Sequence, residues 1–252
     1  MPTYRIDLAY DGTGFHGYAR QEGLRTVQGE FETALFRRIG EVSTAVAGRT
    51  DAGVHAAGQV ISFSADTPID IGTLQRSLNS QLGPEIAVYA VSRVSDGFHA
   101  RFSAIGRRYR YRIWNSPVHD PLQVRTTWHV REPLDAVAMD RAAGSLVGTH
   151  DFASFCRKAP GRSTVRELRQ ASWNRVENLI ELSIAANAFC HRMVRTIVAT
   201  SVEIGRGRLD PDATLEILGK RDQSAGNGSA PPQGLTLMAV EYERVPRVGV
   251  VP

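Results

Sequence analysis

The sequence predicts an α/β protein of two ferredoxin-like halves, each a split β-α-β unit with a mainly antiparallel sheet, flanking a central basic cleft. The order strand, helix, strand pair, helix, strand occurs twice along the chain. The 252 residues are 42% apolar and 22% charged, an ordinary globular composition that can fill two cores. The boundary is expected near Phe102 to Gly106, which gives domains at residues 1–104 and 105–252.

The first half contains four segments with strand-like patterns and two with helical spacing. Thr26 is expected to cap the first helix, because Val27, Phe31, Leu35 and Ile39 then recur every four residues. Ile71, Leu74 and Leu78 mark the second helix. The expected strands are residues 3–10, 42–47, 59–64 and 86–93.

The second half repeats this order. The expected strands are residues 107–114, 165–173, 179–185 and 235–242, and the expected helices are 133–146, 190–204 and 211–218. The last of these helices has Asp210 as its predicted cap, Pro211 at its first position and Gly219 at its end. Small polar residues with Gly and Pro at 224–232 predict a mobile surface loop.

Composition and charge favour a nucleic-acid partner and argue against secretion or membrane insertion. The formal net charge is +4, the pI is about 9.3, and 28 of the 30 basic residues are arginine, which binds phosphates and stacks on bases. GC-rich codon usage also explains much of this excess. No signal peptide or membrane-spanning run is present, and Cys156 and Cys190 lack metal-ligand spacing, so a cytoplasmic protein is expected.

The densest chemical signal is the loop Gly48-Arg49-Thr50-Asp51-Ala52-Gly53, which lies between two expected strands. The two glycines permit a sharp turn and close approach of a ligand to the backbone. Arg49 would favour the ionised form of the Asp51 carboxylate. A plain turn in which the aspartate bonds its own backbone explains the same spacing, so the loop alone does not decide between the two interpretations.

This loop, continued to His55, resembles the catalytic motif of the tRNA pseudouridine synthase A family. Further matches follow in the family's order and cover nearly the whole chain. They are Tyr10-Asp11-Gly12-Thr13-Gly14-Phe15-His16-Gly17, Thr26-Val27-Gln28, Gly58-Gln59-Val60, Phe98-His99-Ala100-Arg101-Phe102-Ser103-Ala104, Arg107-Arg108-Tyr109-Arg110-Tyr111, Gly148-Thr149-His150-Asp151-Phe152, Ala186-Asn187-Ala188-Phe189, Met193-Val194-Arg195 and Gly234-Leu235. Tyr18 and Ala199 depart from the usual tryptophan and glycine, and neither departure is expected to touch the chemistry.

The resemblance implies site-specific isomerisation of uridine to pseudouridine at positions 38 to 40 in the anticodon stem-loop of tRNA, by a homodimer that needs no cofactor. It implies Asp51 as the nucleophile, Tyr109 as the aromatic packed against the target base, and Arg195 as the basic partner of the aspartate. Arg49 would position RNA or the catalytic loop. Arg195 would then come from the second half to the first, which places the expected site in the cleft.

General chemistry is consistent with this implication. The reaction breaks a C–N glycosidic bond and re-forms a bond through C5 of the same base, without redox or phosphoryl transfer. A carboxylate can attack either the ring at C6 or the sugar at C1′, and both routes stay open. A stacked uridine must first be extruded and held, for which an aromatic surface is suited.

The segment 108–112 alternates arginine and tyrosine. On a strand, Tyr109 and Tyr111 would share one face while Arg108, Arg110 and Arg112 share the other. The outer face is either merely solvated or in contact with RNA, and Arg108 and Arg110 are the candidates for RNA contact.

Two other function classes compete with this interpretation. The first is an RNA-binding relative without activity, against which the presence of Asp51, Tyr109 and Arg195 argues. The second is a metal-dependent phosphohydrolase built on His150-Asp151. No pair of histidines has the i, i+4 spacing of a helical metal site, so no metal is expected and structural histidines are favoured.

Overall fold

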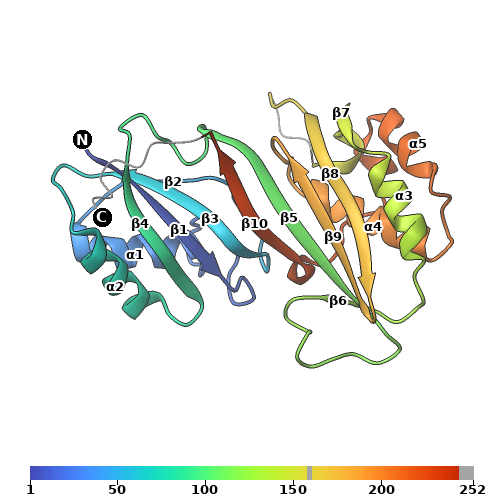
Figure 1. Ribbon diagram of the computed structural model, residues 1–252, viewed down its shortest axis with the longest axis horizontal. Coiled ribbons are helices and arrows are strands. Elements are labelled where there is room, and N and C mark those ends of the chain that lie inside the picture. Colours follow the sequence, from blue (N-terminus) through green and yellow to red (C-terminus); the bar gives the residue numbers. More distant parts are fainter. Residues whose placement is uncertain (158–160, 244–252) are drawn as a thin grey trace. The chain divides into compact units, whose positions relative to one another are not determined.

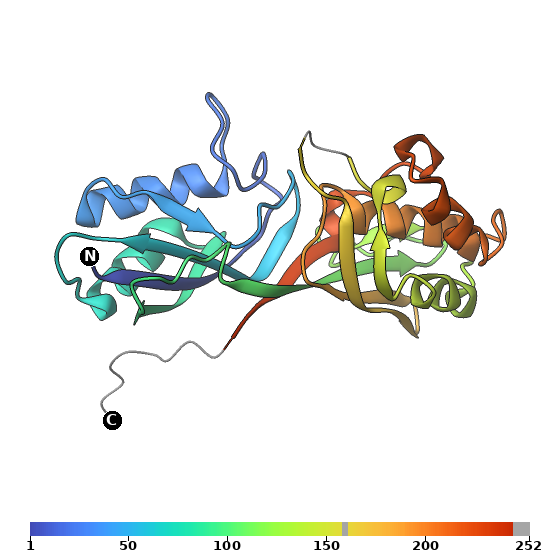
Figure 2. The same ribbon diagram turned by 90° about the horizontal axis from the view of Figure 1, so that it is seen from above.

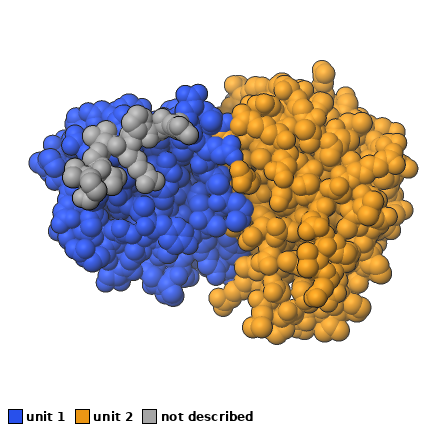
Figure 3. Space-filling model, viewed as in Figure 1, with its two compact units in different colours: residues 1–105, 237–252 blue, residues 106–236 orange. Residues whose placement is uncertain are grey.

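The computed structural model describes residues 1–157 and 161–243, which form two compact units. Unit 1 consists of residues 1–105 together with the segment from Leu237 onward, and unit 2 of residues 106–236 (Figure 3). Within the described residues, no helix has the length and apolarity needed to cross a bilayer.

Unit 1 has the strand arrangement of a ferredoxin-like sheet (Figure 1). Strand β1 pairs antiparallel with both β3 and β4, and β2 pairs antiparallel with the other edge of β3. The order β4-β1-β3-β2 therefore places β3 between the strands that flank α1. The elements are β1 (Thr3–Tyr10), α1 (Val27–Ile39), β2 (Thr44–Val46), β3 (His55–Ser64), α2 (Ile71–Leu82) and β4 (Ile86–Val94).

The helices of unit 1 bury the apolar stripes that the sequence predicts. Helix α1 buries Val27, Phe31 and Leu35, and its N-cap Thr26 accepts a hydrogen bond from Gly29 N at 3.2 Å. Helix α2 buries Leu74, Leu78 and Leu82 and packs against α1 and β4. Between β1 and α1 the chain rises from the unit as a narrow loop, closed by a bridge between Gln21 and Leu24 (Figure 2).

In unit 2, as in unit 1, one strand is inserted between two strands that precede it in the sequence. Strand β9 pairs antiparallel with β5 and with β8, and β7 extends the other edge of β8. Helix α3 packs against β8 and α4. The elements are β5 (Ala104–Asn115), β6 (Trp128–Val130), α3 (Ala136–Gly144), β7 (Gly148–Asp151), η1 (Ala153–Phe155), β8 (Val165–Val176), β9 (Leu179–Ala186), α4 (Met193–Gly205), α5 (Ala213–Lys220), η2 (Gln223–Ala225) and η3 (Pro232–Gly234). Strand β10 (Leu235–Tyr242) follows and belongs to unit 1 from Leu237 onward.

The predicted α/β fold with mainly antiparallel strand pairing is confirmed, and β5 and β6 pair in parallel. The predicted cap of the last helix is wrong. Asp210 Oδ1 accepts a hydrogen bond from Asp212 N at 2.8 Å and so closes a turn before the helix begins. Helix α5 ends at Lys220, and Arg221 rather than a glycine adopts the left-handed conformation after it, with φ of 50°.

The segment 224–232 is also more closely packed than the expected surface loop. It lies against α4, because Ala230 N donates to Arg195 O at 3.0 Å and Asn227 Nδ2 donates to Thr200 Oγ1 at 3.3 Å. Ala230 is only 2% exposed. Gly and Ser are small enough to let this backbone approach the helix, which composition alone does not distinguish from mobility.

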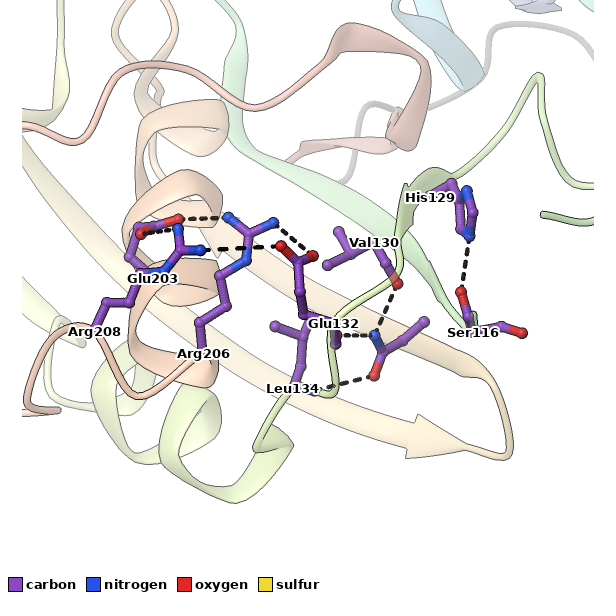
Figure 4. Close-up of polar contacts among 9 residues, drawn as sticks. Ser116, His129, Val130, Glu132, Leu134, Glu203, Arg206 and Arg208 are labelled. Carbon is purple, nitrogen blue, oxygen red and sulfur yellow. Dashed lines mark hydrogen bonds and ion pairs between the residues drawn. The ribbon is translucent and has the colours of Figure 1, made fainter. Parts of the chain in front are cut away.

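A buried asparagine joins four parts of unit 2. Asn115 is 7% exposed, and its Nδ2 donates to Val130 O at 3.0 Å and to Glu132 O at 2.8 Å. Its Oδ1 accepts from Leu134 N at 3.2 Å and from Arg175 Nη2 at 2.8 Å. Figure 4 shows this segment, from which Glu132 also reaches Arg206. Asn115 therefore ties the end of β5 to β6, to the start of α3 and to β8.

We expect Asn115→Ala to lower the free energy of unfolding by about 2–4 kcal/mol, because several buried backbone groups lose their partners at once. Urea unfolding followed by circular dichroism measures this loss. Asn174→Ala, at an exposed position of β8, is the matched control and should change stability little. Equal losses in the two variants would contradict a structural role for the Asn115 amide.

Candidate active site

The predicted catalytic loop connects β2 to β3 in unit 1 and is closed by backbone hydrogen bonds. Val54 N donates to Asp51 O at 3.1 Å, which makes a tight turn, and Gly53 has φ of 76°. Gly53 N donates to Phe15 O at 3.3 Å, and Tyr18 N donates to Thr50 O at 3.0 Å. The loop is thus fastened to the segment that follows β1, and Asp51 itself is half-buried on it.

Beneath the loop lies a buried chain of side-chain hydrogen bonds. Tyr10 Oη lies 2.8 Å from Thr50 Oγ1, and Gln59 Nε2 donates to Tyr10 Oη at 3.2 Å. The same Gln59 amide donates to Gly48 O at 2.7 Å. Tyr10 and Gln59 come from the neighbouring strands β1 and β3 and are 4% and 0% exposed. The chain therefore holds both sides of the loop, Gly48 before Asp51 and Thr50 next to it.

Close backbone contact on the second side of the loop requires glycine at position 12. A Cβ on Gly12 would lie 2.1 Å from Val54 O, far inside van der Waals contact. Gly12 N donates to His55 Nδ1 at 3.0 Å, and His55 is 5% exposed. Because Nδ1 accepts this hydrogen, it does not also donate to the Asp11 carboxylate 3.1 Å away, which accepts instead from Thr13. His55 thus supports the loop.

Tyr18, one of the two departures from the family pattern, lies beside the same loop. It is 1% exposed, and its hydroxyl is buried without a hydrogen-bond partner in the described part of the chain. Burial raises the pKa of this hydroxyl well above its usual value, and the positive charge of Arg49 opposes the rise. Arg49 is exposed, so its guanidinium projects from the loop while its charge acts on the buried ring.

Tyr109 and Arg195, the other residues expected at the site, belong to unit 2. Tyr109 is 9% exposed and meets Phe189 edge-on, with ring centroids 5.1 Å apart. Arg195 is half-buried on α4, and its Nε donates to Ala230 O at 2.7 Å. The segment after Ala230 also accepts a bond from Tyr111 Oη, at Pro231 O and 2.8 Å. Arg195 is therefore held by the packed segment before β10.

Two half-buried arginines on the arginine face of β5, Arg110 and Arg112, share one carboxylate. Arg108 is exposed, whereas Arg110 and Arg112 are half-buried with Nε atoms 3.6 and 3.8 Å from the same Glu181 Oε2. Both Nε atoms are buried and make no hydrogen bond within residues 1–157 and 161–243. Burial and the charge of Arg110 lower the pKa of Arg112. Two guanidinium groups sharing one carboxylate make this face suited to a further anion.

The pair proposed by the metal-dependent alternative has structural partners. Asp151 Oδ1 accepts hydrogen bonds from Ala153 N at 3.1 Å and from Thr164 Oγ1 at 2.5 Å, and so fixes the turn after β7. His150 Nε2 lies 3.4 Å from Val147 O. Among the described residues, no group of three His, Cys, Asp or Glu side chains is placed to hold a metal ion.

Each predicted site residue has a defined place in one of the two units. Asp51 and Arg49 share the β2–β3 loop of unit 1, and Tyr109, Arg108, Arg110 and Arg195 lie on β5 and α4 of unit 2. Tyr10, Tyr18 and Gln59 were not predicted as supports of the loop. Motif matches at Tyr10 and Gln59 were the available signal, but their hydrogen bonds join residues 49 positions apart.

Comparison with known proteins gives one consistent result. A family model described as tRNA pseudouridine synthase matches residues 8–103 and 142–243. A protein of Moorella thermoacetica named tRNA pseudouridine synthase A is 46% identical over 246 residues, covering 96% of this chain and 100% of the relative. Its namesakes from Frankia casuarinae and Brevibacillus brevis are 44% and 43% identical, covering 97% and 96% of this chain and 90% and 100% of those relatives.

The buried tyrosine under the loop predicts a specific loss of stability at alkaline pH. Burial raises the pKa of Tyr10 to about 12, against hydrogen bonds from Thr50 and Gln59 that lower it. The unfolded chain titrates near pH 10, so the stabilisation by neutral Tyr10 is complete below pH 10 and is lost between pH 10 and 12. By linkage it amounts to about 2–3 kcal/mol.

The free energy of unfolding should fall between pH 9 and pH 11.5 in the unsubstituted protein. We expect this fall to be smaller by about 2 kcal/mol in Tyr10→Phe. Urea unfolding at the two pH values measures the difference. Tyr89→Phe, at a 63% exposed tyrosine of β4, should leave the fall unchanged. An identical fall in the Tyr10→Phe variant would contradict the burial of this hydroxyl.

Proposed function

Since this chain belongs to the tRNA pseudouridine synthase family, we propose that it isomerises uridine to pseudouridine at positions 38 to 40 in the anticodon stem-loop of tRNA. The observation that carries the proposal is the Asp51 loop, whose backbone is held on both sides by buried hydrogen bonds. Each chain is proposed to comprise two halves, 1–104 with the aspartate loop and 105–252 with the tyrosine and arginine. Two copies of the chain are proposed to act as a homodimer in the cytoplasm.

In the proposed mechanism, Asp51 is the nucleophile. Its carboxylate attacks the uridine at ring C6 or at sugar C1′, and the N1–C1′ bond breaks. The base turns, C5 bonds to C1′, and the bond between the Asp51 carboxylate and the nucleotide breaks to return the free carboxylate. The C5 proton leaves and N1 gains a proton, so the nucleotide keeps its composition. No electrons or phosphoryl groups are exchanged, and the proposed reaction needs no cofactor.

A half-buried loop aspartate suits this task. Because the surrounding hydrogen-bond network is buried, the loop is already ordered before substrate binds. A carboxylate that is held near its attack position has a high effective concentration. The turn at Asp51 uses the backbone carbonyl of that residue, through Val54 N. This hydrogen bond of the turn therefore does not depend on the identity of the side chain at position 51.

Three further residues are proposed to bind the substrate. Tyr109 would pack against the target base, supported by Phe189 at its edge. Arg195, whose Nε donates to Ala230 O at 2.7 Å, is proposed as the basic partner of Asp51 and as part of the substrate-binding site, with its guanidinium held in a defined orientation. Arg49, exposed on the loop beside Asp51, would position the RNA.

Arg108 and Arg110 are proposed to contact RNA phosphates on the arginine face of β5. The support is that Arg110 and Arg112 share the single carboxylate of Glu181. The Arg110 side chain is 33% exposed, and a phosphate oxygen would bind at this exposed part of its guanidinium.

We expect Asp51→Asn to abolish pseudouridine formation while tRNA affinity changes by less than about threefold. The substitution keeps the size of the side chain but removes its charge and its nucleophilic oxygen, so the loss should exceed the roughly 10²–10⁴-fold typical of a lost general base. Tritium release from C5-labelled uridine in a tRNA transcript measures turnover, and filter binding measures affinity.

Asp66→Asn, at an exposed aspartate of unit 1, is the matched control and should retain full turnover. Substantial turnover by the Asp51→Asn enzyme would contradict the proposed mechanism. If the unsubstituted protein binds tRNA but releases no tritium, the alternative of an inactive RNA-binding protein is correct instead.

A further inference from the structure

An exposed aromatic side chain of unit 1 has no role in the proposed chemistry. Phe102 lies in the turn before β5 and is 76% exposed, the third-highest value among the large apolar side chains of the described residues. Its ring lies against the His99 ring, with centroids 4.4 Å apart and planes 34° from parallel. The Arg101 guanidinium lies over the Phe102 ring, 5.6 Å from its centroid, and the ring still keeps the high exposure given above. An aromatic ring this exposed contributes little to the core.

The turn that displays Phe102 is rigidly built. His99 N donates to Ser103 Oγ at 3.0 Å, and Ser103 N donates back to His99 O at 2.9 Å. His99 Nδ1 accepts hydrogen bonds from the backbone of Arg101 at 3.2 Å and of Phe102 at 3.3 Å. The ring beneath Phe102 is therefore fixed by the same turn that presents Phe102.

The base of the turn is anchored in the core of unit 1. Ala100 is fully buried, its N donates to Ser62 Oγ at 2.9 Å, and its O accepts from Tyr242 Oη at 2.7 Å. Phe98 packs against the Tyr242 ring at 5.0 Å. The exposed ring thus sits on a turn that cannot fold inward to bury it without breaking these bonds.

We propose that Phe102, with His99 behind it and Arg101 beside it, is a stacking platform for one unpaired nucleobase of the RNA substrate. A preorganised aromatic ring binds a base without the entropy cost of ordering a flexible side chain. The adjacent arginine favours a polyanionic ligand and can itself stack on a base. This inference rests on the proposed function, because it assigns the ligand of the platform to the same RNA.

The surroundings favour a base over a protein partner. Protein interfaces bury contiguous apolar area at their centre, with charged groups depleted. Here the exposed ring is flanked within the turn by a histidine and by an exposed arginine. A single flat ring with polar neighbours matches the size and chemistry of one nucleobase.

The test compares three substitutions of Phe102 for binding to a synthetic anticodon stem-loop RNA. Phe102→Ala should weaken binding about 5- to 100-fold, the range of one lost base–aromatic stack. Phe102→Trp should keep the affinity, because it keeps a flat ring. Phe102→Leu keeps apolar area without a π face and should resemble Phe102→Ala. Phe36→Ala, at a 60% exposed phenylalanine of α1, is the matched control and should bind normally.

Abasic residues placed one at a time in the RNA loop identify the base that stacks. At one position the abasic RNA should bind the Phe102→Ala and unsubstituted proteins equally. A change of less than twofold on Phe102→Ala, or full affinity of Phe102→Leu, would overturn the proposal. A change of oligomeric state in Phe102→Ala, seen by light scattering, would overturn it in favour of contact with a second copy. Pseudouridine formation by the unsubstituted protein, measured in parallel, tests the proposed function separately.

Discussion

The hydrogen bonds from Gln59 to Tyr10 and to Gly48, continued from Tyr10 to Thr50, are the interaction on which the candidate site depends. All of these side chains are buried, so no water can replace a bond that is lost, and each unmade bond leaves a polar group unsatisfied. The loop between β2 and β3 consequently has one conformation that satisfies its polar groups. Asp51 is the residue that this conformation presents.

The sheet of unit 1 makes this network possible. Tyr10 is the last residue of β1 and pairs with Ala56 of the adjacent strand β3. Gln59 follows Ala56 closely on β3, so the Tyr10 and Gln59 side chains start near the same end of the two strands. The segment after β1 then passes so close to the loop that position 12 has no space for a side chain. Strand pairing, the buried polar chain and the close backbone contact all act on the same few residues. Rigidity of the catalytic loop is therefore a property of the fold.

Most of the fold could be predicted from the sequence, because long elements leave a periodic pattern. The cap at Thr26 and the buried faces of α1, α2 and β5 follow directly from spacing. Strands β6 and β7, of three and four residues, were not predicted, since so few residues cannot establish an alternation. The start of α5 was misplaced because Asp210 and Asp212 both have capping chemistry, and only the backbone decides between them.

The candidate site could be predicted only in part. Asp51 stood out because its loop resembles the catalytic motif of a known family, whereas the spacing of the loop alone left a plain turn open. Gln59 did not stand out, because a glutamine in a strand is expected to be exposed, and its burial depends on the loop that it supports. Residues that touch a ligand leave local motifs, whereas the residues that hold them become visible only when distant strands are brought together.

The most direct test of this account is the single-turnover rate of Gln59→Leu on tRNA, measured at a temperature where the variant is fully folded. The substitution keeps the side-chain volume but removes the hydrogen bonds from Gln59 to Tyr10 and to Gly48 of the loop. If the buried network positions Asp51, the rate of the chemical step should fall about 10- to 100-fold while tRNA affinity stays the same. An unchanged rate in the folded variant would contradict the account, because Asp51 would then hold its reactive position without the network.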